Sequence, residues 1–242
     1  MTKIARKIPW SRIGAESAVI VVSILLAFSI DAWHEQRADR VLEAGYLHRI
    51  GDELRDAKAA LETILLDVNA SLLFVPDLTE FFDGHMAAGD HQRLVVAIYK
   101  FGLDPLEVGF DVSTFDDLVS TGRLTLISDA EVRQAIQRAY AELQRLAPIR
   151  APHRSEYMAA LRGWIPRSVR QQIRAACPER SPYSACSDLH LDEETVRSIV
   201  EQIDRREALL TFQIRETGLA TLNGVGQQVM AALDQALARL DR

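Results

Sequence analysis

The hydrophobic pattern of the chain is uneven, and its most apolar stretch lies close to the start. Residues 13–33 read IGAESAVIVVSILLAFSIDAW, and no other stretch of the sequence is as apolar. Residues 17–30 carry no charge. A run of this length and composition is typical of a helix that crosses a bilayer. The pattern therefore predicts a single transmembrane helix over residues 13–33.

The residues at the two ends of this stretch suit the two faces of a membrane. Trp10 and Trp33 are 23 positions apart, roughly 34 Å along a helix at about 1.5 Å per residue, which is close to the thickness of a hydrocarbon core. Glu16 follows Arg12 by one turn, so the two can pair in the headgroup layer. Asp31 lies beside Trp33. We expect these five residues to lie at the membrane interfaces.

Two other interpretations of the stretch stay open. It has the basic start and apolar run of a secretory signal, and Ala27-Phe28-Ser29 resembles a cleavage site. The apolar pattern nevertheless continues past this site without a proline or glycine, and a continuous helix is a poor protease substrate. A buried core helix of a soluble protein would need other helices of similar apolarity around it. The permanent membrane anchor is the interpretation that we favour.

A period of three to four residues continues after the apolar stretch and predicts two long amphipathic helices. The first covers residues 34–75, so the membrane helix is expected to run into it without a break. The second begins near Asp192 and reaches the end of the chain, with three glycines at which it can bend. Neither helix can bury its apolar stripe alone, so we expect the two to pack together.

Shorter helices are expected between these two. They are predicted after Asp77, from His91 to Gly102, from Ser113 to Ser120, from Ser128 to about Leu146, and from about Pro152 with a bend at Pro166. Ser113 with Asp116, and Ser128 with Glu131, have the spacing of capping boxes. Strand signals are nearly absent. The predicted fold is all-α: an N-terminal transmembrane helix continuous with a long amphipathic helix, and an elongated helical bundle as the body.

Charge and cysteines predict the topology. Four basic residues precede the span, and the positive-inside rule keeps them in the cytoplasm. This divides the chain into a cytoplasmic N-terminus (1–12), a transmembrane helix (13–33) and an extracytoplasmic α-helical domain (34–242), with the body in the periplasm of a bacterium. The two cysteines, Cys177 and Cys186, lie in the loop-like stretch CPERSPYSAC, and we expect a disulfide between them in that oxidising compartment. Two free thiols are the alternative; metal binding is weaker because no histidine completes a zinc site.

The composition indicates a folded protein without a nucleic-acid partner. Of 242 residues, 48% are hydrophobic and 26% are charged, with a net charge of −6. Residues 1–33 hold four basic groups and two acids, so the remaining 209 residues carry 24 basic and 32 acidic groups, a net charge of −8. An acidic body without a basic stripe is a poor partner for phosphate backbones, so we predict no nucleic-acid binding.

No sequence motif assigns a chemistry. The chain has no nucleophile elbow, phosphate loop, dinucleotide fingerprint or zinc-protease helix. We therefore predict no catalytic residues, cofactor or metal, and a non-enzymatic protein-interaction module outside the cytoplasm whose partners are the lipid bilayer and a second protein or copy. Gly14 with Ala18, and Ser23 with Ala27, form small-residue pairs that suit helix self-association. The alternative is a periplasmic sensory or small-molecule-binding bundle that acts through a partner membrane protein.

Several segments resemble a known family. WSRIGAE and SILLAFSIDAW in the span, YLHRIGDEL after it, and STFDDLVSTGRLTLISDAEVR in the centre of the chain are similar to a family of short bacterial single-pass membrane proteins of unknown function. The resemblance covers the first 55 residues and residues 113–140. It implies an N-terminal single-pass helix followed by an α-helical body, and it implies no activity and no catalytic residues.

Overall fold

The structure is a computed structural model that describes residues 10–103, 110–150, 154–203 and 205–241. These residues form helices and connecting loops, and none of them forms a strand. The helices are α1 (Trp10–Leu72), α2 (Val75–Phe82), α3 (His91–Phe101), α4 (Ser113–Ser120), α5 (Ala130–Arg150), α6 (Arg154–Trp164), α7 (Arg167–Ala176), α8 (Glu193–Gln202) and α9 (Arg205–Leu240), with short 3-10 turns at Ala88–Asp90, Leu124–Leu126 and Tyr183–Ala185. The predicted all-α fold is confirmed.

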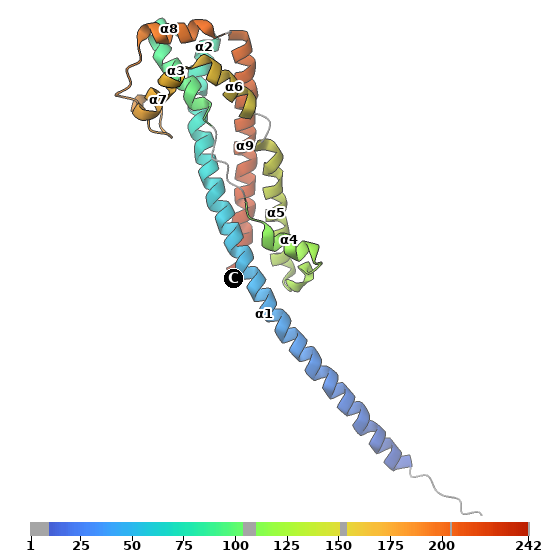
Figure 1. The fold of residues 1–242 in the computed structure, drawn as a ribbon. Coiled ribbons are helices and arrows are strands. Elements are labelled where there is room, and N and C mark those ends of the chain that lie inside the picture. The colour runs from blue at the N-terminus through green and yellow to red at the C-terminus, as the bar shows by residue number, and fades with distance from the viewer. Residues whose placement is uncertain (1–9, 104–109, 151–153, 204, 242) are drawn as a thin grey trace, which may run out of the picture.

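Helix α1 joins the apolar N-terminal stretch to the body in one piece. Its 63 residues correspond to about 95 Å at 1.5 Å per residue, and Figure 1 shows its first half leaving the rest of the molecule. From residue 21 to Gly45 no residue of α1 is buried, and Tyr46 is the first that is. The predicted continuity between the apolar helix and the amphipathic helix is confirmed.

The body is built around the second half of α1. Helix α9 packs along α1 on one side and along α5 on the other, and α4 lies against α1 (Figure 1). Helices α2, α3, α6, α7 and α8 gather at the end of the body that is farthest from the N-terminus. Helices α1 and α9 lie close together at Gly226, where a Cβ atom would lie 2.6 Å from Cδ2 of Leu65. One continuous core therefore joins both long helices, as their stripes predict.

The long C-terminal stripe is not one helix, and in this respect the prediction is wrong. The backbone of Ile203 is extended, with φ −76° and ψ 111°, and α8 ends there. Helix α8 packs on α3, whereas α9 turns back along α1 and α5. Ile203 itself is 5% exposed. It therefore keeps the spacing of the apolar stripe although the chain changes direction at this residue. The three glycines at which we expected bends, Gly218, Gly224 and Gly226, lie inside the single helix α9.

Both predicted capping boxes are also wrong. Two other side chains accept from the start of α4. Asp111 accepts from the Ser113 N–H at 3.0 Å, and Glu53 of α1 accepts from the Thr114 N–H at 2.8 Å and the Ser113 hydroxyl at 3.2 Å. At α5, Asp129 accepts from the N–H groups of the first turn, while Ser128 donates to Glu43 of α1. Helix α5 also continues past Pro148 to Arg150, since a proline near a helix end removes only one hydrogen bond.

Candidate functional site

The predicted membrane-interface residues all lie on α1. Trp10, Arg12 and Glu16 belong to its first two turns, but their side chains lie outside the described part of the chain. Asp31 is exposed. Trp33 is 55% exposed, and the guanidinium of Arg37 lies 5.7 Å from its ring centroid. An aromatic ring with a cation one turn away is typical of a membrane surface. The interface assignment of these five residues stays a prediction.

The predicted disulfide is confirmed: Cys177 and Cys186 are bonded, and both are buried. Cys177 directly follows α7, and the loop that the bond closes contains the 3-10 turn Tyr183–Ala185. Gln92 of α3 fixes the chain around this loop. Its side-chain amide donates to the Tyr183 hydroxyl and to the Leu189 carbonyl, and its amide oxygen accepts from the Leu191 N–H. These hydrogen bonds hold the disulfide loop in place at the end of the body that is farthest from the N-terminus.

A buried lysine joins the same loop to α3. The Lys100 ammonium donates to three successive backbone carbonyls, those of Cys177 at 3.3 Å, Pro178 at 2.5 Å and Glu179 at 3.1 Å. The residue is only 2% exposed. Burial lowers the pKa of Lys100, and the nearby Glu179 carboxylate opposes that shift. Three carbonyl acceptors for one ammonium satisfy all its donors, so the disulfide loop serves as the polar partner of a buried charge.

A pocket lies beside this lysine, between the C-terminal end of α1, α3, α7 and the disulfide loop. Its volume is about 190 Å³. Its walls combine charged and apolar side chains, namely Asp67, Ala70, Ser71, Phe74, Lys100, Leu103, Arg174, Glu179 and Arg180. Three cations and two carboxylates among these give the lining a net charge of +1, in a body that is acidic as a whole. This pocket is the candidate functional site.

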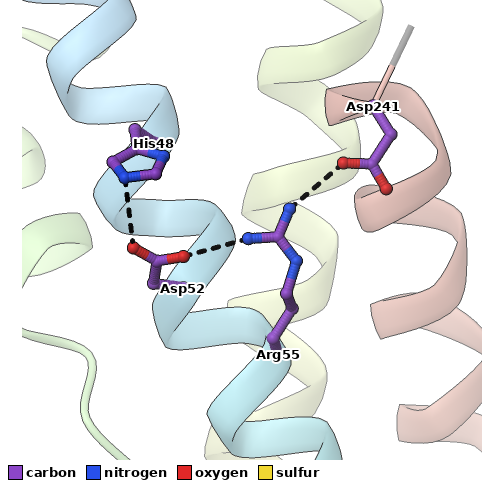
Figure 2. A network of polar contacts seen from close by, with 4 residues as sticks. All are labelled: His48, Asp52, Arg55 and Asp241. Atoms are coloured by element: carbon purple, nitrogen blue, oxygen red, sulfur yellow. Dashed lines mark hydrogen bonds and ion pairs between the residues drawn. The ribbon is translucent and has the colours of Figure 1, made fainter.

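Two further polar clusters lie outside the pocket, and both join helices of the body. The Glu53 carboxylate also accepts from the buried Tyr140 hydroxyl at 2.6 Å, and burial together with Glu53 raises the pKa of Tyr140. This cluster connects α1, α4 and α5. Figure 2 shows the second, in which Arg55 lies between Asp52 at 3.0 Å and Asp241 at 3.1 Å, while His48 lies 3.6 Å from Asp52. It attaches Asp241, the residue that follows α9, to α1 at the exposed surface.

The described residues do not point to a metal centre. Among them no three His, Cys, Asp or Glu side chains are grouped so as to hold an ion. No protein-family model, curated protein or solved structure matches this chain. The resemblance to short single-pass bacterial membrane proteins therefore stays a prediction, and functional inference depends on the helix α1, the pocket and the surface of the body.

Sequence reasoning identified one part of the candidate site and missed the rest. The cysteines were found from their spacing and the loop-like residues between them. Lys100 was missed because a lysine in the last turn of a helix is usually exposed, where it interacts favourably with the helix dipole. Ser71 and Arg174 have no local pattern that marks them, because they are separated by 103 positions and line the same pocket only in the folded chain. No signal in the sequence could have found that pair.

Proposed function

We propose that this protein is a single-pass protein of the bacterial inner membrane that holds a non-enzymatic interaction module in the periplasm. Residues 1–12 lie in the cytoplasm, residues 13–33 cross the bilayer, and the helical domain 34–242 lies outside the cytoplasm. The observation that carries this proposal is the exposure of α1. From Val21 to Ile30 its large apolar side chains are 50–67% exposed on every side of the helix, a surface that a bilayer would cover favourably.

By length and composition, the described part of the chain contains one helix able to cross a membrane, and it lies near the N-terminus. Its apolar residues after Gly45 include buried core residues of the body, whereas the large apolar side chains from Val21 to Trp33 are each at least half exposed. We therefore assign the lipid-facing surface to the segment of α1 from Val21 to Trp33. The disulfide agrees with a periplasmic body, because such bonds persist in oxidising compartments.

The topology predicts the behaviour of reporter fusions. A reporter that is active only in the periplasm, fused after Arg242, should be active, and a reporter that requires the cytoplasm should be silent at the same position. Replacing Lys3, Arg6, Lys7 and Arg12 with glutamine is the matched control, since it removes the charges that orient the helix and should reduce periplasmic activity. Activity from the cytoplasmic reporter alone would contradict the proposed orientation.

The partner surface that we propose is on α1 near the far end of the body. Leu66 of α1 and Leu73, the residue that follows α1, are 55% and 54% exposed. The Leu73 N–H donates to the Asn69 carbonyl, so the last turn extends to Leu73, and a separation of seven positions places the two leucines on one face. A photo-crosslinking amino acid at either position should give a discrete crosslinked product in intact membranes. Gln144, exposed on α5, is the control position and should give none. Absence of a product at both leucines, or equal products at all three positions, would contradict a protein partner on this face.

A further inference from the structure

Most of the charged groups around the pocket already have partners. All three donors of Lys100 are directed to carbonyls of the disulfide loop. Arg180 donates to Asp67 at 2.6 Å, and this contact raises the pKa of Arg180. These groups hold the walls of the pocket together and set its electrostatic potential. They are not the groups that would make new hydrogen bonds to a ligand.

Three polar side chains of the lining have no such partner. Arg174, Glu179 and Ser71 make no side-chain hydrogen bond and no ion pair with the described residues. Arg174 and Glu179 are exposed at the pocket. Ser71 is 4% exposed as a residue, and its hydroxyl lines the pocket without being fully enclosed. Among the described residues, the pocket thus presents one guanidinium, one carboxylate and one hydroxyl that have no hydrogen-bond partner.

We propose that this pocket binds a small zwitterion that carries an ammonium and a carboxylate, with a free amino acid as the representative ligand. The guanidinium of Arg174 and the hydroxyl of Ser71 take the carboxylate, and the positive charge of Lys100 favours it there. The carboxylate of Glu179 takes the ammonium. Phe74 and Leu103 supply an apolar wall for a side chain. The proposal is independent of a protein partner on α1.

The size of the pocket restricts the ligand. About 190 Å³ is below the roughly 300–1,000 Å³ of pockets that enclose drug-sized molecules, so this pocket would enclose a smaller molecule. The equal number of available positive and negative groups argues against a simple anion, which would meet Glu179, and against a simple amine, which would meet Arg174. A molecule with both charges satisfies both side chains.

The experiment uses the full-length protein in detergent micelles and the twenty free L-amino acids as probes. Each is screened by the shift that it causes in thermal unfolding, and those that stabilise the protein are measured by calorimetry. We expect at least one amino acid to bind. Arg174→Gln and Glu179→Gln should each raise its Kd by about tenfold or more, as expected for the loss of a charged hydrogen bond. Arg167→Gln is the control, because Arg167 is exposed on the same helix and does not line the pocket.

Two analogues of the tightest amino acid test the zwitterion itself. One lacks the amino group and the other lacks the carboxylate, and both should bind at least tenfold more weakly. Each variant is first shown to keep the circular dichroism and thermal midpoint of the unaltered protein without ligand. The proposal is overturned if none of the twenty amino acids binds, if the deaminated acid binds as well as the amino acid, or if Arg174→Gln and Glu179→Gln bind like Arg167→Gln.

Discussion

Replacing both Cys177 and Cys186 with serine is expected to lower the free energy of unfolding by about 2–5 kcal/mol. The bond closes a short loop across nine positions, and opening it returns conformational freedom to the unfolded chain. The effect in this protein has a second cause. Lys100 is buried and depends on three carbonyls at the start of that loop, so a loop that moves leaves a buried charge without acceptors.

This expectation can be measured by urea unfolding of the full-length protein in micelles, followed by circular dichroism. Addition of a reductant to the unaltered protein should reproduce the loss seen in the double variant. Ser184→Ala and Ser187→Ala, at exposed positions in and beside the loop, should change stability by less than about 0.5 kcal/mol. Equal stability of the oxidised and reduced proteins would show that the loop keeps its conformation without the bond.

Shortening Leu54 to alanine should have an effect of the same size, about 2–5 kcal/mol. Leu54 lies on the body half of α1 and is fully buried. Removing its side chain leaves a cavity between helices that are held by many other contacts, so the site cannot collapse to fill it. The loss combines the transfer free energy of the deleted atoms with the cost of that cavity.

Leu66→Ala is the matched control for this substitution. Both leucines are on the same helix, but Leu66 is 55% exposed, so its replacement should leave the unfolding midpoint almost unchanged. The same urea titration measures both variants. A small effect at Leu54, or equal effects at the two positions, would contradict the packing of α1 in the core. If Leu66 contacts a partner, its replacement should reduce crosslinking without reducing stability.

The elements that sequence reasoning predicted well are those defined by local pattern. The stripe of α1 and the loop around the two cysteines are properties of neighbouring residues, so a period of three to four residues and two prolines were enough to indicate them. The boundaries that depend on distant residues were wrong. Glu53 caps a helix that begins 60 positions later, and nothing near Ser113 in the sequence reveals this acceptor.

The candidate pocket depends even more on residues that are distant in the sequence. Its walls come from α1, α3, α7 and a loop. The arrangement of its charged groups depends on hydrogen bonds between distant residues: Arg180 donates to Asp67, and Lys100 donates to carbonyls 77–79 positions away. Likewise, the apolar period through Ile203 is compatible with one straight helix or with two that meet at an angle. Periodicity reports which residues are buried, but it does not report the direction of the helix that follows.

Under the proposed topology, the unbroken course of α1 also determines how the body faces the membrane. Between Trp33 and Tyr46 the helix has no buried residue, and these 13 positions correspond to about 20 Å. Each residue inserted there would rotate the whole body by about 100° around the helix axis and raise it by about 1.5 Å, whereas seven residues would change its facing by only about 20°. Length changes in this segment therefore act as changes of angular phase, and under the proposed topology the membrane-spanning end of α1 sets the direction in which Leu66 and Leu73 point.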